Sequence, residues 1–160
     1  MDDSERRALT NRFLRVMRAI YLTSLTAANV CAAHGRLHLG ETRSRLEAHA
    51  AELRDRQVEA ARLLELFGRG RPMLRWMIGP LTSLWGRLTT LTGRRFSLHM
   101  LGNMEAQGAR LTTYAQNLAR ELAHVAAVEA LVRLQRAEDA RKKYIISQLE
   151  LAQDADEALK

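Results

Sequence analysis

The near absence of helix-breaking residues constrains the fold of this chain more than any other feature. Proline occurs only at positions 72 and 80, and residues 109–160 contain neither proline nor glycine. Hydrophobic residues make up 47% of the chain but aromatic residues only 5%, so the core must be aliphatic. Leucine, alanine and arginine, which all favour helix, dominate the composition. The sequence therefore predicts an all-α domain, and 160 residues suffice for one substantial core.

Apolar residues recur at helical spacing in four long segments. We expect helices at about 4–33, at 41–67, from 94 to beyond 114, and at 124–151. Glycines at 68 and 70, followed by Pro72, end the second helix. A turn is expected near 117–121, because without it the last helix would reach roughly 55 residues. The predicted organisation is one helical domain over 1–153 and a frayed polar tail at 154–160.

Between the second and third helices lies an amphiphilic segment, residues 73–93, that holds both tryptophans. It is expected to form one or two short helices broken at Gly79-Pro80. No run in the chain reaches the roughly 18–20 uninterrupted apolar residues of a membrane-spanning helix. Helices that lie on a membrane combine an apolar face with basic flanks. The side chains expected to face lipid are those of Met73, Arg75, Trp76, Met77, Ile78, Leu81, Trp85 and Arg87. Plain capping of the bundle end is the alternative.

The formal net charge of +7 favours an anionic partner such as a membrane surface or nucleic acid, or else a solvated basic surface. No basic stripe with interleaved aromatic residues and no helix-turn-helix pattern occurs, so nucleic acid is not the expected partner. The lone Cys31 excludes an intramolecular disulfide and favours a reducing compartment. The polar N-terminus is unlike a secretory signal. The expected location is cytoplasmic and peripheral, on the inner face of a membrane.

Motifs typical of catalysis are sparse. Glu121 and His124 form the one Glu-x-x-His in the chain, a spacing that puts both groups on one helix face in bundle metal sites. A local hydrogen-bonded pair at the expected turn is the plainer interpretation, and His49 with Glu52 has the reverse order. Cys31 is expected to be a buried thiol. No zinc-spaced cluster, phosphate loop or nucleophile elbow is present.

Several short motifs, in order and at nearly matching spacing over residues 12–150, resemble the demethoxyubiquinone hydroxylases. They are Leu14-Arg15-Val16, His49-Ala50-Ala51-Glu52, Arg71-Pro72 before the amphiphilic segment, Glu105 and Glu138. That family comprises ferritin-like, membrane-associated di-iron enzymes of ubiquinone biosynthesis. The resemblance implies a ferritin-like four-helix bundle with an additional amphiphilic helical hairpin between the second and third helices.

Carried over residue by residue, the resemblance also implies where metal ligands would lie. The six positions are Tyr21, Arg54, Gln57, Glu105, Glu138 and Arg141. Only Glu105 and Glu138 keep the carboxylate, and arginine cannot ligate a metal. No metal cofactor is therefore expected. Arg54 and Arg141 are expected to form ion pairs with Glu105 and Glu138. A mono-iron site with a Tyr21 phenolate is the alternative.

Three functions follow as hypotheses from the resemblance and the charge. The first is a metal-free relative of the hydroxylases that binds a quinone or other isoprenoid lipid at a membrane, or scaffolds a partner there as a homodimer or as a heteromer with a related hydroxylase. The second is an active hydroxylase whose iron is held by a rebuilt site. Its candidate ligands are Glu105, Glu138, Glu121, His124, Glu52 and His49. The third is a basic helical interaction module.

Overall fold

The computed structural model describes residues 2–36, 39–70, 75–89 and 94–157, without the side chains of 75–78, 94–98, 141–142, 144–146 and 148–157. Five helices and no strands occur in these ranges, which confirms the predicted all-α class. The helices are α1 (Asp3–Gly35), α2 (Gly40–Leu66), α3 (Arg75–Thr89), α4 (Arg94–Glu121) and α5 (Val125–Glu157).

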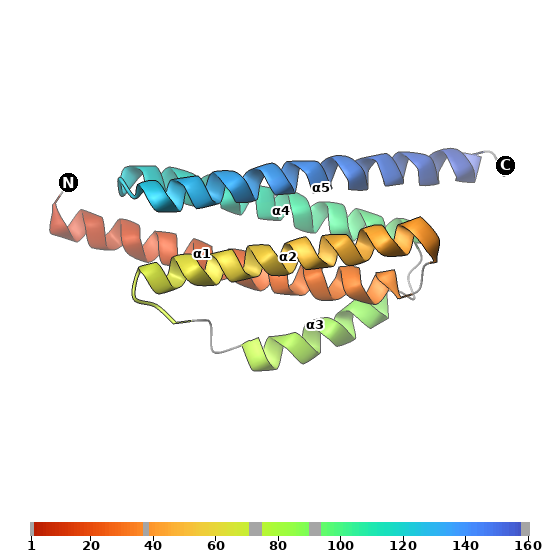
Figure 1. Cartoon of the computed structure of the whole chain (residues 1–160), viewed down its shortest axis with the longest axis horizontal. Helices are drawn as coiled ribbons and strands as arrows, with labels where there is room; N and C mark the ends of the chain where they lie inside the picture. The colour runs from red at the N-terminus through yellow and green to blue at the C-terminus, as the bar shows by residue number, and fades with distance from the viewer. Residues whose placement is uncertain (1, 37–38, 71–74, 90–93, 158–160) are drawn as a thin grey trace.

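Four long helices lie side by side in a bundle, and the short α3 lies outside it (Figure 1). The chain runs along α1, returns along α2, and is carried back by α3, so that α4 runs in the same direction as α2. Such a long crossover connection is typical of ferritin-like bundles. Helix α1 packs against α2, α3 and α4, and α4 packs against α5, whereas α2 and α5 touch sparsely.

Local side-chain chemistry fixes the helix ends. Asp2 accepts a hydrogen bond from the Glu5 backbone N–H (2.7 Å), and the Glu5 carboxylate accepts one from Asp2 N–H (3.2 Å). This reciprocal capping box begins α1. The turn between α4 and α5 falls at residues 122–124, just after the predicted 117–121. Ala123 adopts φ 52° there, and the His124 N–H reaches the Ala119 carbonyl, which closes the end of α4.

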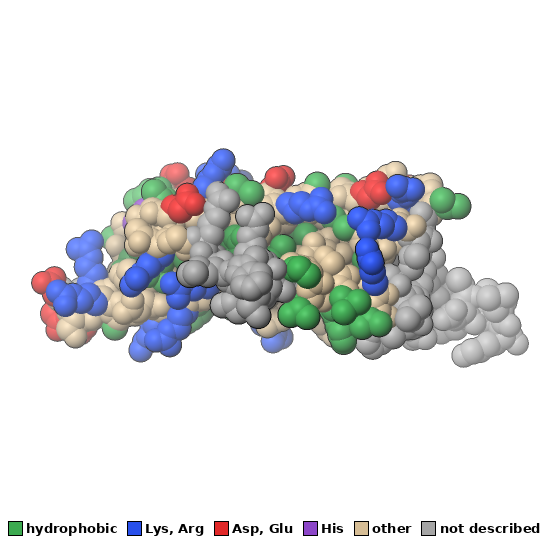
Figure 2. All heavy atoms as spheres, turned by 90° about the horizontal axis from the view of Figure 1, so that it is seen from below, with side chains coloured by type: hydrophobic (Ala, Val, Ile, Leu, Met, Phe, Trp, Pro, Cys, Tyr) green, Lys and Arg blue, Asp and Glu red, His purple; other side chains and the backbone are tan. Residues whose placement is uncertain are grey.

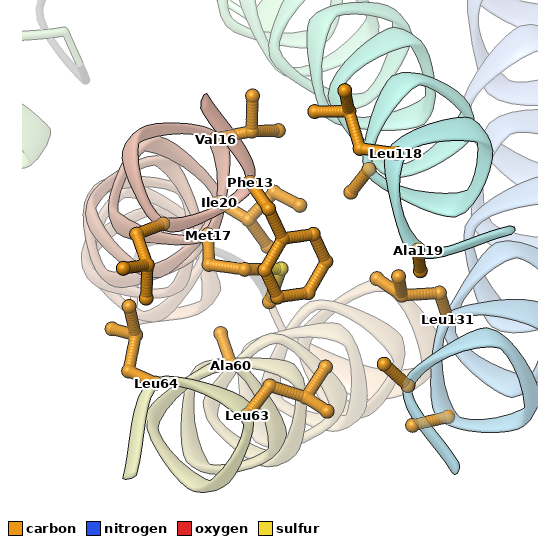
Figure 3. Close-up of a cluster of buried hydrophobic side chains, with 14 of the residues drawn as sticks. Phe13, Val16, Met17, Ile20, Ala60, Leu63, Leu64, Leu118, Ala119 and Leu131 are labelled. Carbon is orange, nitrogen blue, oxygen red and sulfur yellow. The ribbon is translucent and has the colours of Figure 1, made fainter. Parts of the chain in front are cut away.

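The main core is aliphatic, as the composition predicts. Buried side chains of α1, α2, α4 and α5 interdigitate around Phe13 and Met17 (Figure 3). Alanines such as Ala60 and Ala119 let the helices approach closely among larger leucines. A second cluster lies between the other ends of α1 and α2 and includes Cys31, whose thiol is buried as expected.

Two boundaries differ from the sequence prediction. Helix α3 is continuous through Pro80 rather than broken at Gly79-Pro80. Proline near the beginning of a helix forgoes one backbone hydrogen bond, and the following turns still form. Helix α5 continues to Glu157, so the predicted tail from 154 is helical over its first residues. The expected lipid-facing Met73 lies outside the described residues, as do the side chains of 75–78.

Among the described residues, α1 is the one helix with the length and mean hydropathy of a membrane-spanning segment, and half of its apolar window is buried inside the bundle. Core helices meet the same criterion. Because α1 packs against three other helices, its apolar residues are accounted for by the core.

Candidate functional site

The centre of the bundle holds an ion pair between Arg56 of α2 and Glu138 of α5. Arg56 Nη2 lies 2.5 Å from Glu138 Oε1, and the two side chains are 3% and 0% exposed. Opposite charges held this deep interact in a medium of low dielectric constant, which strengthens their attraction but makes removal of either partner expensive. The pair joins α2 to α5 across the seam where these helices otherwise touch sparsely.

Helix α4 completes this centre with three positions one turn or two apart. The buried Thr112 hydroxyl accepts a hydrogen bond from Arg56 Nη2 (3.2 Å) and donates one to Glu138 Oε1 (2.7 Å). Gly108 lies one turn earlier, and a Cβ at this position would come within 2.7 Å of Arg56 Nη1. Glu105, 4% exposed, lies one further turn earlier on the same face. The absence of a side chain at Gly108 therefore makes room for the guanidinium.

A groove of about 400 Å³ between α2 and α5 reaches this centre from the surface. Its lining includes Arg56 itself, Val58 and Glu59 from α2, and Ala130 and Leu134 from α5. Glu59 lies at its rim, 3.6 Å from Arg133 of α5. Arg56 is thus the member of the buried pair that belongs to the lining of this groove.

The expected pairing of Arg54 with a buried carboxylate is wrong, although the kind of interaction was predicted correctly. Arg54 is exposed, and Arg56 makes the ion pair. Side chains two positions apart on a helix are rotated by about 200° around its axis, so residues 54 and 56 point in nearly opposite directions. The inward i, i+3 pair of α2 is Leu53 and Arg56, and Gln57 is half-buried beside it.

The remaining predicted metal-site positions differ in their surroundings. Tyr21 is 2% exposed and belongs to the aliphatic core cluster. Glu105 and Glu138 are both buried. The side chain of Arg141 lies outside the described residues, so its expected pairing stays a prediction.

The fallback ligands Glu121 and His124 lie far along the bundle from the two buried glutamates. Glu121 is exposed at the end of α4, about 24 Å along the helix from Glu105 at 1.5 Å per residue. His124 immediately precedes α5. Its Nδ1 accepts a hydrogen bond from Ala127 N–H (3.3 Å), and the centre of its ring lies 4.9 Å from that of Phe67. His124 therefore has a capping and packing role. Glu52 is exposed and His49 half-buried on α2.

A transition metal does not fit the donor set of the bundle centre. Structural and catalytic sites use at least three protein ligands from His, Cys, Asp and Glu. Within the described part of the chain, no three such residues are grouped closely enough to hold an ion. Arg56 also brings a permanent positive charge to the carboxylate of Glu138.

A second feature is the way α3 is attached to α1, which uses polar and small residues. Asn29 donates a hydrogen bond to the Thr82 hydroxyl (2.7 Å), which in turn donates to the Gly79 carbonyl (3.1 Å). Seven residues later the arrangement repeats. His34 Nε2 lies 3.0 Å from the Thr89 hydroxyl, which donates to the carbonyl of Gly86 (2.8 Å). His34 Nε2 and the Thr89 hydroxyl thus share a hydrogen bond that links α1 to α3.

Gly86 brings α3 close to the backbone of α1. A Cβ at this position would lie 3.2 Å from the Asn29 carbonyl oxygen and 3.2 Å from Val30 Cα, both backbone atoms of α1. Backbone moves aside less easily than a flexible side chain does, so a larger residue at this position would push the two helices slightly apart. Over residues 79–89, where the side chains of α3 are described, the inner face thus includes Gly79, Thr82, Gly86 and Thr89.

Over residues 79–89, the outward side of α3 carries a row of exposed apolar side chains. We call Leu81, Leu84, Trp85 and Leu88 the α3 stripe; their exposed fractions are 62%, 55%, 53% and 48%. The spacing i, i+3, i+4, i+7 puts all of them on one side of the helix. Seen from below, hydrophobic side chains gather on this helix (Figure 2). Arg87, also exposed, lies within the same turn. Over residues 79–89, α3 therefore turns polar and small residues toward α1 and the α3 stripe toward solvent.

Five residues of these two features were not predicted from the sequence: Arg56, Thr112, Gly108, Asn29 and His34. Two signals point to them. Arg56 continues the buried spacing of α2, in which it follows Leu53 by one turn. The inner face of α3 appears in the sequence as Gly-x-x-Thr repeated after seven residues, at Gly79 and at Gly86. The lipid-facing prediction includes Leu81 and Trp85, and both are exposed.

Comparisons with known proteins identify the fold. No family model matches the sequence, and no curated protein matches it. Among solved structures the chain is similar to Rhodobacter capsulatus bacterioferritin, with a TM-score of 0.73 and 13% sequence identity over 90% of this chain and 87% of that one. That structure is described as having a metal-free dinuclear site and a haem iron.

The protein is thus a ferritin-like helical bundle. Likeness at 13% identity concerns the fold alone. The finer resemblance to demethoxyubiquinone hydroxylases stays a prediction.

Proposed function

We propose that this protein is a metal-free relative of the demethoxyubiquinone hydroxylases that docks on an anionic membrane surface through the α3 stripe. There it binds a quinone or other isoprenoid lipid, or scaffolds a related hydroxylase in ubiquinone-related metabolism. In this proposal the protein is cytoplasmic and peripheral, on the inner face of a membrane. The observation that carries the proposal is the orientation of α3, whose apolar α3 stripe faces solvent.

A surface helix in a globular protein ordinarily buries its apolar side. Here the inner face is held by hydrogen bonds with Asn29 and His34, and the apolar α3 stripe faces solvent. A contiguous exposed apolar patch usually meets another apolar phase, either a partner protein or a membrane.

Charge favours the membrane over an apolar protein partner. The chain carries +7, and Arg87 lies on α3 beside the exposed leucines. Juxtamembrane basic residues contribute about 1 kcal/mol each at an anionic leaflet. Trp85 suits the headgroup level, where the indole places its ring in the apolar layer and its N–H in the polar layer.

Vesicle co-sedimentation tests the proposal with a matched pair of variants. Leu84→Glu puts a charge into the α3 stripe, and Val125→Glu puts the same charge at a similarly exposed apolar position, 69% exposed, at the beginning of α5. We expect the native chain to bind vesicles containing phosphatidylglycerol. Leu84→Glu should lower the partition coefficient on the order of tenfold, since about 1–2 kcal/mol of apolar transfer is lost.

Val125→Glu should bind like the native chain. Equal binding of Leu84→Glu and the native chain would contradict docking through the α3 stripe. Adding a short-chain ubiquinone to the vesicles separates the two versions of the proposal. Tighter binding with the quinone supports a lipid ligand, and unchanged binding favours the scaffold.

A further inference from the structure

The bundle centre poses a problem of charge that is independent of α3 and of membranes. Glu105 and Glu138 are buried on the adjacent helices α4 and α5. Ferritin-like bundles that hold metal place carboxylates from facing helices around a shared cation. A buried carboxylate needs a positive charge, hydrogen-bond donors or a proton to be stable. The question is what supplies the positive charge in this chain.

Arg56 supplies a positive charge inside the bundle, next to the buried Glu138. It enters from α2, on the side of Glu138 opposite to its own helix, and its guanidinium reaches both Glu138 and the Thr112 hydroxyl. A guanidinium stays charged at every physiological pH, so it can replace a metal ion as a counter-charge. Unlike a metal ion, it cannot be removed by a chelator or exchanged.

Two further observations indicate a site shaped around the guanidinium. Gly108 leaves the space that a Cβ would fill, 2.7 Å from Nη1 and 2.9 Å from Nη2. Thr112 is placed to accept from the guanidinium and donate to the carboxylate, which metal ligation at that oxygen would disturb. Arg56 is also part of the lining of the groove between α2 and α5, whereas Glu105 and Glu138 are not.

We infer that Arg56 is the resident cation of this bundle, and that the space around Glu138 and Glu105 becomes a divalent-metal site when a ligand side chain replaces that guanidinium. The native chain keeps carboxylates at the centre, and Arg56 blocks their use as ligands. Replacing Arg56 by histidine would give a nitrogen donor from α2 and oxygen donors from α4 and α5. That set of one imidazole and two carboxylates matches a ligand combination that zinc accepts.

The test is zinc titration of the full chain and its Arg56→His variant, followed by calorimetry and by the midpoint of thermal unfolding. Arg54→His is the matched control, since it makes the same change two residues away at an exposed position. Arg56→His with Glu138→Gln removes one expected ligand. We expect Arg56→His to bind zinc at least about 100-fold more tightly than the native chain and Arg54→His, and Glu138→Gln to abolish the gain.

Each outcome decides the inference. Tight zinc binding by Arg56→His that depends on Glu138 supports it. If this variant is unfolded without metal, recovery of helical circular dichroism on adding zinc supports it equally, because binding then drives folding. Equal affinity of Arg56→His and Arg54→His overturns it, and so does a variant that stays unfolded with zinc. Tight binding at the bundle centre by the native chain also overturns it, because Arg56 would then not exclude metal.

Discussion

Replacing Arg56 by methionine should be among the most destabilising single changes in this protein. Methionine is unbranched and apolar, so it fills the space of the aliphatic part of arginine while removing the charge. Glu138, 0% exposed at its side chain, would then be buried with Thr112 as its remaining partner among those described above. Leaving one member of a buried ion pair uncompensated costs about 3–5 kcal/mol.

For a chain of this size, each 1 kcal/mol lowers the midpoint of thermal unfolding by about 2–4 °C, so we expect a fall of roughly 6–20 °C. Urea unfolding followed by circular dichroism measures the change in free energy directly. The double variant Arg56→Met with Glu138→Met removes both charges. It should lie within about 1 kcal/mol of the native chain or be more stable, because desolvation of the pair is relieved.

Arg54→Met is the control and should change stability by less than about 0.5 kcal/mol, since Arg54 is exposed. Two results would refute the reasoning. One is a loss of under about 1 kcal/mol for Arg56→Met, which would mean that the pair is solvated. The other is a double variant as unstable as the sum of the single variants, which would mean that the two side chains act independently.

Three glycine and alanine changes test neighbouring features by urea unfolding. Gly108→Ala should destabilise the protein by about 1–3 kcal/mol, because the added Cβ displaces the Arg56 guanidinium. This loss exceeds the gain in helix propensity of about 1 kcal/mol. In the Arg56→Met background the same change should be neutral or stabilising. Gly86→Ala should cost about 1 kcal/mol and raise hydrogen exchange across α3, since the Cβ meets α1 backbone near Val30; unchanged exchange would contradict the close approach. Ala123→Gly should stabilise by about 0.5–1 kcal/mol, because φ 52° strains alanine but not glycine, and a loss of stability would show that the turn is not strained.

The sequence predicted the helices well because their signals are local. Long apolar periodicity and the scarcity of glycine and proline mark α1, α2 and the beginning of α4 within a few residues. The turn between α4 and α5 was placed slightly early, since no glycine or proline marks it. Ala123 takes the left-handed conformation there without a sequence signal, and the hydrogen bond from His124 to Ala119 stabilises it.

An ion pair between an arginine and a buried glutamate was predicted for the bundle centre, but the position of the arginine on α2 was wrong. Both buried carboxylates, Glu105 and Glu138, were identified, and an arginine was expected beside them. The wrong arginine was chosen because positions carried over from a resemblance shift by one or two residues without changing the match. Packing decides the register, since Leu53 and Ala60 must face inward and therefore Arg56 does as well.

The mounting of α3 could not be derived from amphiphilicity alone. The sequence pattern of an amphiphilic helix is the same whether its apolar face meets a protein core or a membrane. Only the partners of the polar face decide, and these are Asn29 and His34, some 50 residues away in sequence, as the separations of 53 and 55 show. The exposure of Leu81 and Trp85 agrees with the predicted orientation, and the partner of that face stays a proposal.

The most direct test of the outward apolar face is the fluorescence of Trp85 at a bilayer. With Trp76 replaced by phenylalanine, Trp85 is the one tryptophan left in the chain. On addition of phosphatidylglycerol vesicles, docking through the α3 stripe predicts a shift of its emission to shorter wavelength and quenching by brominated acyl chains. Emission that stays at the wavelength of a water-exposed indole, in protein shown to sediment with the vesicles, would contradict it.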